Sequence, residues 1–140
     1  MANYGEGAAT YNAVGGEKGL TALVNDFYKI MHESPDYKKI RDMHPKDLDV
    51  TTDKLLVFLT GWMGGKSEYS KKYGPMSIPG AHSHLAIDEL ERDMWLSCMT
   101  EALIKQNYPE DLIEYLIIQL GRPAERIREV SVMMREKKQK

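Results

Sequence analysis

The feature that most limits the fold of this chain is the spacing of its apolar residues, which follows the period of an α-helix. In the stretch EKGLTALVNDFYKIMHES, apolar side chains recur at intervals of three and four residues and form a single stripe. The stretch follows Gly15-Gly16 and ends near Pro35, and both are typical of helix boundaries. We therefore expect a helix that packs one face on a core. The stripe consists of Leu20, Leu23, Val24, Phe27, Tyr28 and Met31.

A second helix is predicted in DVTTDKLLVFLTGWMGG, where Asp49 or Thr51 would cap the start and Gly64-Gly65 suits the end. The segment between these two helices, around Tyr37 and DMHPKDL, is polar and is expected to be irregular. The stretch from residue 66 to 81 is rich in glycine and proline, so we expect a loop with at most a short helical turn. The apolar stripe of the second helix consists of Leu55, Phe58, Leu59 and Trp62.

The third strong helix opens at a capping box formed by Asp88 and Glu91 and runs to about Asn107. A nearly all-apolar helix follows in PEDLIEYLIIQL, and Gly121 with Pro123 is expected to kink or break it before AERIREVSVMMREKK. No convincing strand pattern and no internal repeat is found, so the chain is predicted to be all-α. The stripe of the third helix contains Leu90, Met94, Trp95, Cys98, Met99 and Ala102.

Length, charge and cysteine content narrow the class of protein. A chain of 140 residues is expected to form one domain with one core. Its net charge of −2 does not favour binding to nucleic acid or to anionic membranes. The basic end REKKQK is interpreted as a solvated helix end or a frayed tail. Cys98 is the only cysteine, which excludes an intramolecular disulfide and favours a reducing compartment. Without a membrane-spanning run or a signal peptide, a cytoplasmic location is expected.

The sequence contains no motif for the common catalytic or metal-binding chemistries. Histidines and aromatic residues therefore remain as the candidate functional residues. There is no glycine-rich phosphate loop, and His82 with His84 alone cannot complete a tetrahedral zinc site. From residue types alone, either histidine is more simply a structural residue than a metal ligand. A haem site would favour a ligand role for one of them, because haem requires a single protein imidazole and an apolar slot between helices.

Three blocks in the same order resemble the truncated haemoglobins of group II: GGEKGLTALVNDFY, FLTGWMGG and HSHLAIDELERDMWLSCM. The resemblance covers roughly residues 11 to 130. It implies a two-over-two helical sandwich around haem b, in a single truncated-globin domain over residues 1–140. Residues 1–14 would be an N-terminal extension, and residues 136–140 a basic tail.

The resemblance also assigns the residues that face the iron. In the family, the proximal histidine lies thirteen positions before the signature tryptophan, which here relates His82 to Trp95 and excludes His84. Tyr28 matches the distal tyrosine, and Trp95 matches the tryptophan that defines the group. His44 falls where many members have tyrosine or phenylalanine. Alternatively, His44 caps the following helix, or it approaches the iron as a sixth ligand.

Further cofactor contacts carry over from the same resemblance. Tyr69 and Lys54 match positions that reach the haem propionates, although Lys54 could equally be solvated. The family often has an arginine before the proximal histidine, and Ala81 stands here. The remaining expected contacts are Thr51, Leu55 and Phe58 on the distal helix, with Leu85 and Ile87 after the proximal histidine.

These assignments imply a haem protein that reversibly binds oxygen, carbon monoxide and nitric oxide. Tyrosine and tryptophan both donate to a ligand with partial negative charge, so oxygen release should be slow. Slow release suits a scavenger, sensor or redox catalyst better than oxygen transport. The alternative is a haem enzyme, with a reductase, that detoxifies nitric oxide or acts as a peroxidase. A helical interaction module without cofactor is the third hypothesis.

Overall fold

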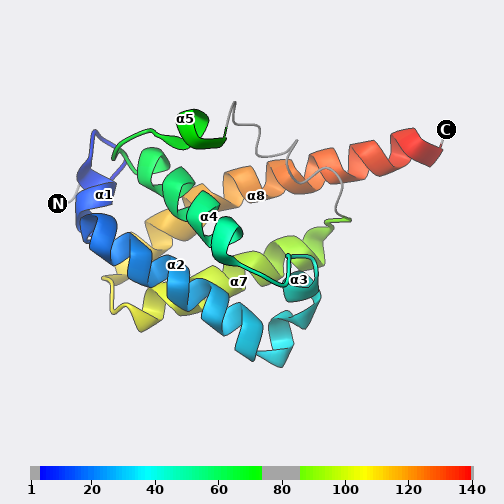
Figure 1. Ribbon diagram of the computed structural model, residues 1–140, viewed down its shortest axis with the longest axis horizontal. Coiled ribbons are helices and arrows are strands. Elements are labelled where there is room, and N and C mark those ends of the chain that lie inside the picture. Colours follow the sequence, from blue (N-terminus) through cyan, green and yellow to red (C-terminus); the bar gives the residue numbers. More distant parts are fainter. Residues whose placement is uncertain (1–3, 74–85, 140) are drawn as a thin grey trace.

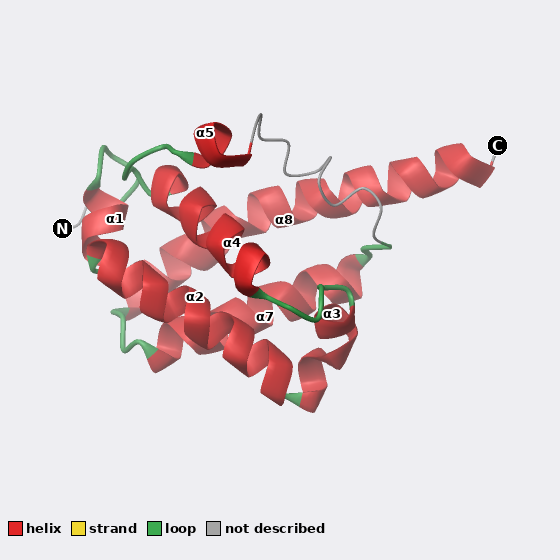
Figure 2. Ribbon diagram, in the orientation of Figure 1, coloured by secondary structure: helices red, strands yellow, loops and turns green. Residues whose placement is uncertain are grey.

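The computed structural model describes residues 4–73 and 86–139, and its regular elements are all helical (Figures 1 and 2). No strand occurs in these two ranges, as the apolar period predicts. His82, His84, Leu85 and Ala81 lie outside the described residues. The helices are α1 (Ala9–Ala13), α2 (Gly16–Glu33), the 3₁₀ turn η1 (Pro35–Tyr37), α3 (Lys38–Asp42), α4 (Asp49–Trp62), α5 (Tyr69–Tyr73), α7 (Glu89–Lys105) and α8 (Glu110–Gln139).

Four long helices form two layers around the core. In the view of Figure 1, α2 and α4 lie in front of α7 and α8. Helix α2 contacts both α4 and α7, and α7 in turn packs along α8. All six residues of the predicted α2 stripe are buried, so α2 is the central helix of the core. The N-terminal α1 belongs to the same body, because Thr10 and Val14 at its two ends are buried.

Helix α4 confirms the predicted C-cap and corrects the predicted N-cap. Gly64 has a positive φ of 99° after the last turn, and its amide donates to the Gly61 carbonyl at 3.2 Å. At the other end, Leu48 is the N-cap, and no side chain caps it. The Asp47 carboxylate accepts from the amide of Asp49 at 2.9 Å. Neither Asp49 nor Thr51 therefore caps α4, because a turn held by the preceding aspartate starts the helix.

The segment that the sequence suggested to be irregular is helical in its first part, so the prediction was wrong there, whereas residues 43–48 form no regular element, as predicted. Residues 35–42 form η1 and α3, and they bury Tyr37 and Ile40. The Tyr37 hydroxyl lies 3.0 Å from Ser97 Oγ and also donates to the Glu101 carboxylate on α7. Elements this short span too few turns to show a helical period in the sequence. The segment is ordered by these contacts to α7.

Helix α7 begins at the predicted capping box, where Glu91 Oε1 accepts from the Asp88 amide at 2.7 Å. Cys98, Met99 and Ala102 of its stripe are buried. Leu90 is 55% exposed, which corrects its place in the stripe. Glu91 is buried in its stead, with Lys39 Nζ 2.6 Å from Oε2. Neighbouring helix residues point about 100° apart, so burying Glu91 turns Leu90 outward.

Helix α8 is continuous over 30 residues and contains Pro123, so the predicted break does not occur. Proline removes one helical hydrogen bond and strains the preceding turn. The part beyond Pro123 is held by contacts to α7, including Arg92 with Glu125 at 2.8 Å and Arg135 with Asp88 at 2.7 Å. Among the helices of the described ranges, none is long and apolar enough to cross a membrane.

Candidate functional site

Three of the predicted site residues meet in one connected series of aromatic rings. The Trp95 ring packs edge-on to Phe27 with 5.1 Å between centroids, and Phe27 packs against Tyr28 at 4.9 Å. Tyr28 then meets His44 at 5.8 Å. Helices α7 and α2 and the turn after α3 each supply part of this series. The structure therefore brings Tyr28, His44 and Trp95 to one region, with Phe27 between the tryptophan and the tyrosine.

The Tyr28 side chain is buried and carries a hydroxyl donor. The residue is 7% exposed, and its hydroxyl bonds to none of the residues in 4–73 and 86–139. Burial, with a smaller contribution from Cys98, raises the pKa of Tyr28 well above its usual range. The side chain therefore keeps its proton at all physiological pH values. A hydroxyl that keeps its proton and bonds to none of the described residues is suited to donate to a bound ligand.

His44 is oriented by the end of α3. Its Nδ1 lies 2.7 Å from the carbonyl oxygen of Ile40, and because a carbonyl only accepts, Nδ1 carries a proton. The bond satisfies a carbonyl of α3, whereas the N-cap of the following helix α4 is Leu48. His44 therefore caps the preceding helix instead of the following one. Its ring remains half-buried beside Tyr28.

The predicted apolar wall lies on α4. Leu55 and Phe58 are half-buried and pack against the core, and Thr51 is half-buried one turn earlier. Phe58 also stacks on Trp62, with 6.3 Å between ring centroids. A cavity of about 230 Å³ brings Phe58 and Tyr69 together, although Tyr69 belongs to α5. The other residues that line it are Val57, Gly61, Trp62 and Ser67.

Lys54 is placed differently from Tyr69, its proposed companion. Its ammonium group lies over the Tyr73 ring, 5.3 Å from the centroid, and the residue is exposed. Lys72 pairs with Asp53 at 2.6 Å, and the Tyr73 hydroxyl donates to the same carboxylate. These two hydrogen bonds, the one from Lys72 first, lower the pKa of Asp53. This cluster was missed from the sequence, where nothing distinguishes Asp53 and Tyr73 from other surface residues.

Of the residues expected on the proximal side, Ile87 is described. Its amide donates to Ser131 Oγ at 2.9 Å, and its carbonyl accepts from Arg135 at 3.2 Å. The expected roles of His82 and Leu85 concern residues outside the described ranges.

Comparisons with known proteins agree with this geometry. The family model of the bacterial-like globins matches residues 9–129. The group 2 truncated haemoglobin YjbI of Bacillus subtilis (strain 168) is 33% identical over 108 residues, which are 77% of this chain and 79% of that protein. The group II 2-on-2 haemoglobin of Agrobacterium tumefaciens superposes with a TM-score of 0.80 at 31% identity, covering 85% of this chain and 92% of that one. A truncated oxygen-avid haemoglobin from Bacillus subtilis gives 0.75 at 31% identity, covering 84% and 97%.

The chain belongs to the bacterial-like globin family. Its relatives are group II truncated haemoglobins, so both the resemblance seen in the sequence and the two-over-two fold are confirmed. Membership in this family supports haem-based ligand binding.

The described residues suit a haem. A porphyrin needs apolar walls and a few well-placed polar groups. Leu55 and Phe58 offer a half-buried apolar face on α4, and the buried Tyr28 side chain offers a hydroxyl that bonds to none of the described residues. Trp95 is half-buried and adds an indole N–H, which can only donate. This donor set fits a small, partly negative ligand on the distal side.

Proposed function

We propose that this protein binds haem b and reversibly binds oxygen and other diatomic ligands, including carbon monoxide and nitric oxide. The observation that carries the proposal is the hydroxyl of the buried Tyr28 side chain, which bonds to none of the described residues. A haem would supply the iron at which the ligand binds. His82 is the proposed proximal ligand because haem needs one axial imidazole and the family spacing to Trp95 selects this residue.

The distal side chains would stabilise a ligand by donating hydrogen bonds. Oxygen gains partial negative charge on binding, whereas carbon monoxide gains far less, so donors favour oxygen. Tyr28 and Trp95 are both proposed donors, with His44 as the third. Each bond in a site that excludes water is worth ~1–3 kcal/mol, or roughly 5- to 150-fold in affinity. Several donors together would make oxygen release slow.

The wall of α4 would hold the cofactor and exclude water from the distal side. Thr51, Leu55 and Phe58 are the proposed contacts on this helix, and they lie on its half-buried face. Tyr69 is the better candidate for a propionate contact, because it shares the cavity beside Phe58. Lys54 has its ammonium group over Tyr73, so it would have to turn to reach a propionate. Leu85 and Ile87 are the proposed contacts on the proximal side.

Slow oxygen release favours scavenging or sensing over delivery, and a reductase would be needed to keep the iron ferrous. We also propose a cytoplasmic location, because the single cysteine suits a reducing compartment. The whole chain is proposed to form one domain, since Thr10 and Val14 of the N-terminal region are buried in the same body as α2.

Titration of the purified protein with haemin tests the proposal. A Soret band should saturate at one haem per chain, and the reduced protein should bind oxygen and carbon monoxide reversibly. Failure to retain haem on a desalting column would refute it. Rates with nitric oxide and with peroxide, measured with a reductase present, separate ligand binding from the enzymatic alternative. Turnover of either substrate faster than oxygen release would replace scavenging or sensing with catalysis.

A further inference from the structure

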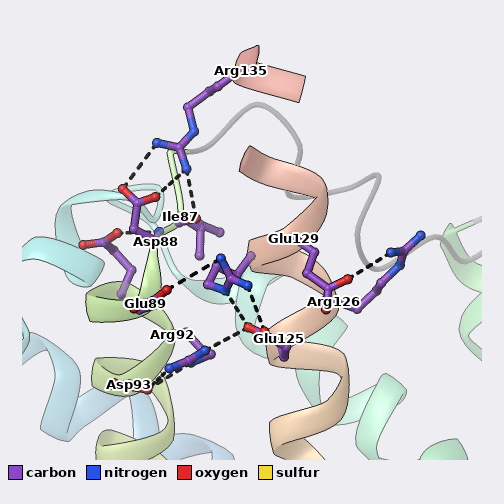
Figure 3. Close-up of polar contacts among 11 residues, drawn as sticks. Ile87, Asp88, Glu89, Arg92, Asp93, Glu125, Arg126, Glu129 and Arg135 are labelled. Carbon is purple, nitrogen blue, oxygen red and sulfur yellow. Dashed lines mark hydrogen bonds and ion pairs between the residues drawn. The ribbon is translucent and has the colours of Figure 1, made fainter. Parts of the chain in front are cut away.

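Two side chains of α8 hold both backbone groups of Ile87. Its N–H donates to Ser131 Oγ at 2.9 Å, and its carbonyl accepts from Arg135 Nη2 at 3.2 Å. The same guanidinium reaches both oxygens of Asp88, at 2.7 and 3.3 Å (Figure 3). A planar guanidinium that binds carboxylate and carbonyl together fixes the direction of the chain as well as its position. We call Ile87, Asp88, Ser131 and Arg135 the α8 anchor.

The buried part of the α8 anchor is Ser131. It is fully buried, so its hydroxyl offers the Ile87 amide a partner that water does not replace. Arg135 is more exposed, yet its Nε also lies 3.3 Å from the Ser131 carbonyl, which links the two anchor residues. The basic end REKKQK was expected to be solvated or frayed. Its first residue, Arg135, is instead bonded to the chain before α7, whereas Glu136 and Lys137 are exposed as expected.

A second layer of charges fixes α8 relative to α7. Glu125 accepts from Arg92 of α7 at 2.8 Å and from Arg128 at 2.5 and 2.9 Å. Figure 3 shows Arg92 and Glu125 facing each other across the two helices, below Asp88 and Arg135. All of these α8 residues follow Pro123, so the part of α8 after the proline is attached at the start of α7.

One part of the α8 anchor lies close in the sequence to His82, the proposed proximal ligand of the haem. Ile87 lies five residues after His82 in the chain. Ser131 and Arg135 lie beyond residue 129, where the match to the bacterial-like globin family ends. The two α8 residues of the anchor therefore lie outside the matched range, whereas Ile87 and Asp88 lie within it.

We propose that Ser131 and Arg135 are positioning residues for the proximal ligand: they fix Ile87 and Asp88 on α8, and Ile87 follows His82 by five residues. The inference rests on the proposed function, because it takes His82 as the axial ligand. An axial imidazole on a loosened segment should bind the iron less firmly and release the haem sooner.

The test compares Ser131→Ala and Arg135→Met with the control Arg126→Met. Arg126 forms an exposed pair with Glu129 on the same helix, at 3.2 Å, and belongs to no part of the anchor. Three quantities are measured for each variant: the exchange rate of the Ile87 amide hydrogen, the iron–histidine stretching frequency of the ferrous protein, and the rate of haemin transfer to apomyoglobin. Thermal unfolding of each apoprotein reports any general loss of stability.

Both anchor variants should speed Ile87 exchange and haemin transfer by about 2- to 10-fold, the worth of one or two hydrogen bonds. They should also shift the iron–histidine frequency, which a loss of stability elsewhere would leave in place. The control should match the parent in all three. Because the Arg135 side chain is 37% exposed, Arg135→Met keeps the test open even if Ser131→Ala does not fold.

Faster Ile87 exchange with an unchanged iron–histidine frequency and unchanged haemin transfer would overturn the inference, because the anchor would then be purely structural. Equal effects in Arg126→Met would overturn it as well. Failure of the proposed function is distinct: it would show in the parent protein, as a ferrous haem without an iron–histidine band.

Discussion

The Tyr28 ring meets the His44 ring edge to face, with 5.8 Å between centroids and 73° between planes. One residue comes from the centre of the core helix α2 and the other from the turn after the short helix α3. Because His44 Nδ1 is committed to the Ile40 carbonyl, Nε2 is the ring nitrogen on which a proton would be gained or lost. The pair thus joins Tyr28, which keeps its proton, to an imidazole whose orientation is set by α3.

Replacing the permanent donor should affect oxygen selectively. Tyr28→Phe is expected to speed oxygen dissociation roughly 5- to 150-fold, with little change for carbon monoxide, which gains less charge. Stopped-flow and flash-photolysis rates measure both. Tyr108→Phe is the matched control, because its hydroxyl donates to the distant Val14 carbonyl at 2.7 Å. Equal acceleration of both ligands in Tyr28→Phe would mean that the ring acts by packing alone.

Trp95→Phe should give a change in the same direction. If Trp95 and Tyr28 donate to one ligand, the double variant should be non-additive, since neighbouring groups that share a partner couple energetically. Oxygen dissociation rates of the parent, the two single variants and the double variant give the coupling directly. If the effects of the two single variants on oxygen dissociation simply add, Tyr28 and Trp95 do not donate to the same ligand.

His44 should make oxygen affinity depend on pH. An imidazole normally changes charge between about pH 5 and 8. Protonation of Nε2 would make it a donor to the ligand, so oxygen dissociation should slow as pH falls. His44→Phe should have a flat profile over the same range. A parent profile that is already flat, or one that survives in His44→Phe, removes His44 from the ligand site. A purely high-spin ferric spectrum at neutral pH would exclude His44 as a sixth ligand.

Cys98 should be inert in the native protein. It is fully buried, its Sγ lies 3.4 Å from the Phe27 carbonyl, and burial, with the charge of Glu101, raises the pKa of the thiol to about 12. The thiolate is the reactive form, so a disulfide reagent at pH 8 should react only as fast as the chain opens. The reaction in urea should be complete and fast. Prompt stoichiometric reaction without denaturant would contradict the burial of Cys98.

Glu125 should stabilise the protein above acidic pH only. Hydrogen bonds from Arg128 and then Arg92 lower its pKa from 4.5 to about 2. A carboxyl with a lowered folded-state pKa adds stability above its unfolded pKa and loses it as pH falls toward the folded one. Because its side chain is 37% exposed, Glu125→Gln should cost no more than roughly 1 kcal/mol at pH 7. Urea unfolding should show the full difference at pH 7 and a much smaller one at pH 2, and an equal difference at both would exclude an ionic origin.

The sequence predicted the long helices well because their burial follows a simple period. Each of the six stripe residues of α2 is buried, and the capping box of Asp88 and Glu91 is present as read. Periodicity fails where a tertiary contact overrides it. Leu90 is exposed because Glu91 turns inward to Lys39, and that pairing joins residues 52 positions apart in the sequence.

The candidate site could be predicted only in part, and this prediction came from resemblance to a family instead of from hydrophobic periodicity. Tyr28, His44 and Trp95 were assigned through resemblance to a family, and the structure brings them into one series of rings. The order of α3, which aims His44, depends on the contact of Tyr37 with α7, so no local pattern shows it. The role of Arg135 was missed for the same reason, because its partner Asp88 is remote in sequence.

The identity of the proximal ligand is the central claim, and absorption spectroscopy of two histidine variants tests it most directly. His82→Gly should lose haem on desalting, and added imidazole should partly restore the Soret band, because a free imidazole can occupy the axial position. His84→Ala should retain haem like the parent. Loss of the Soret band in His84→Ala, with normal retention in His82→Gly, would contradict the account.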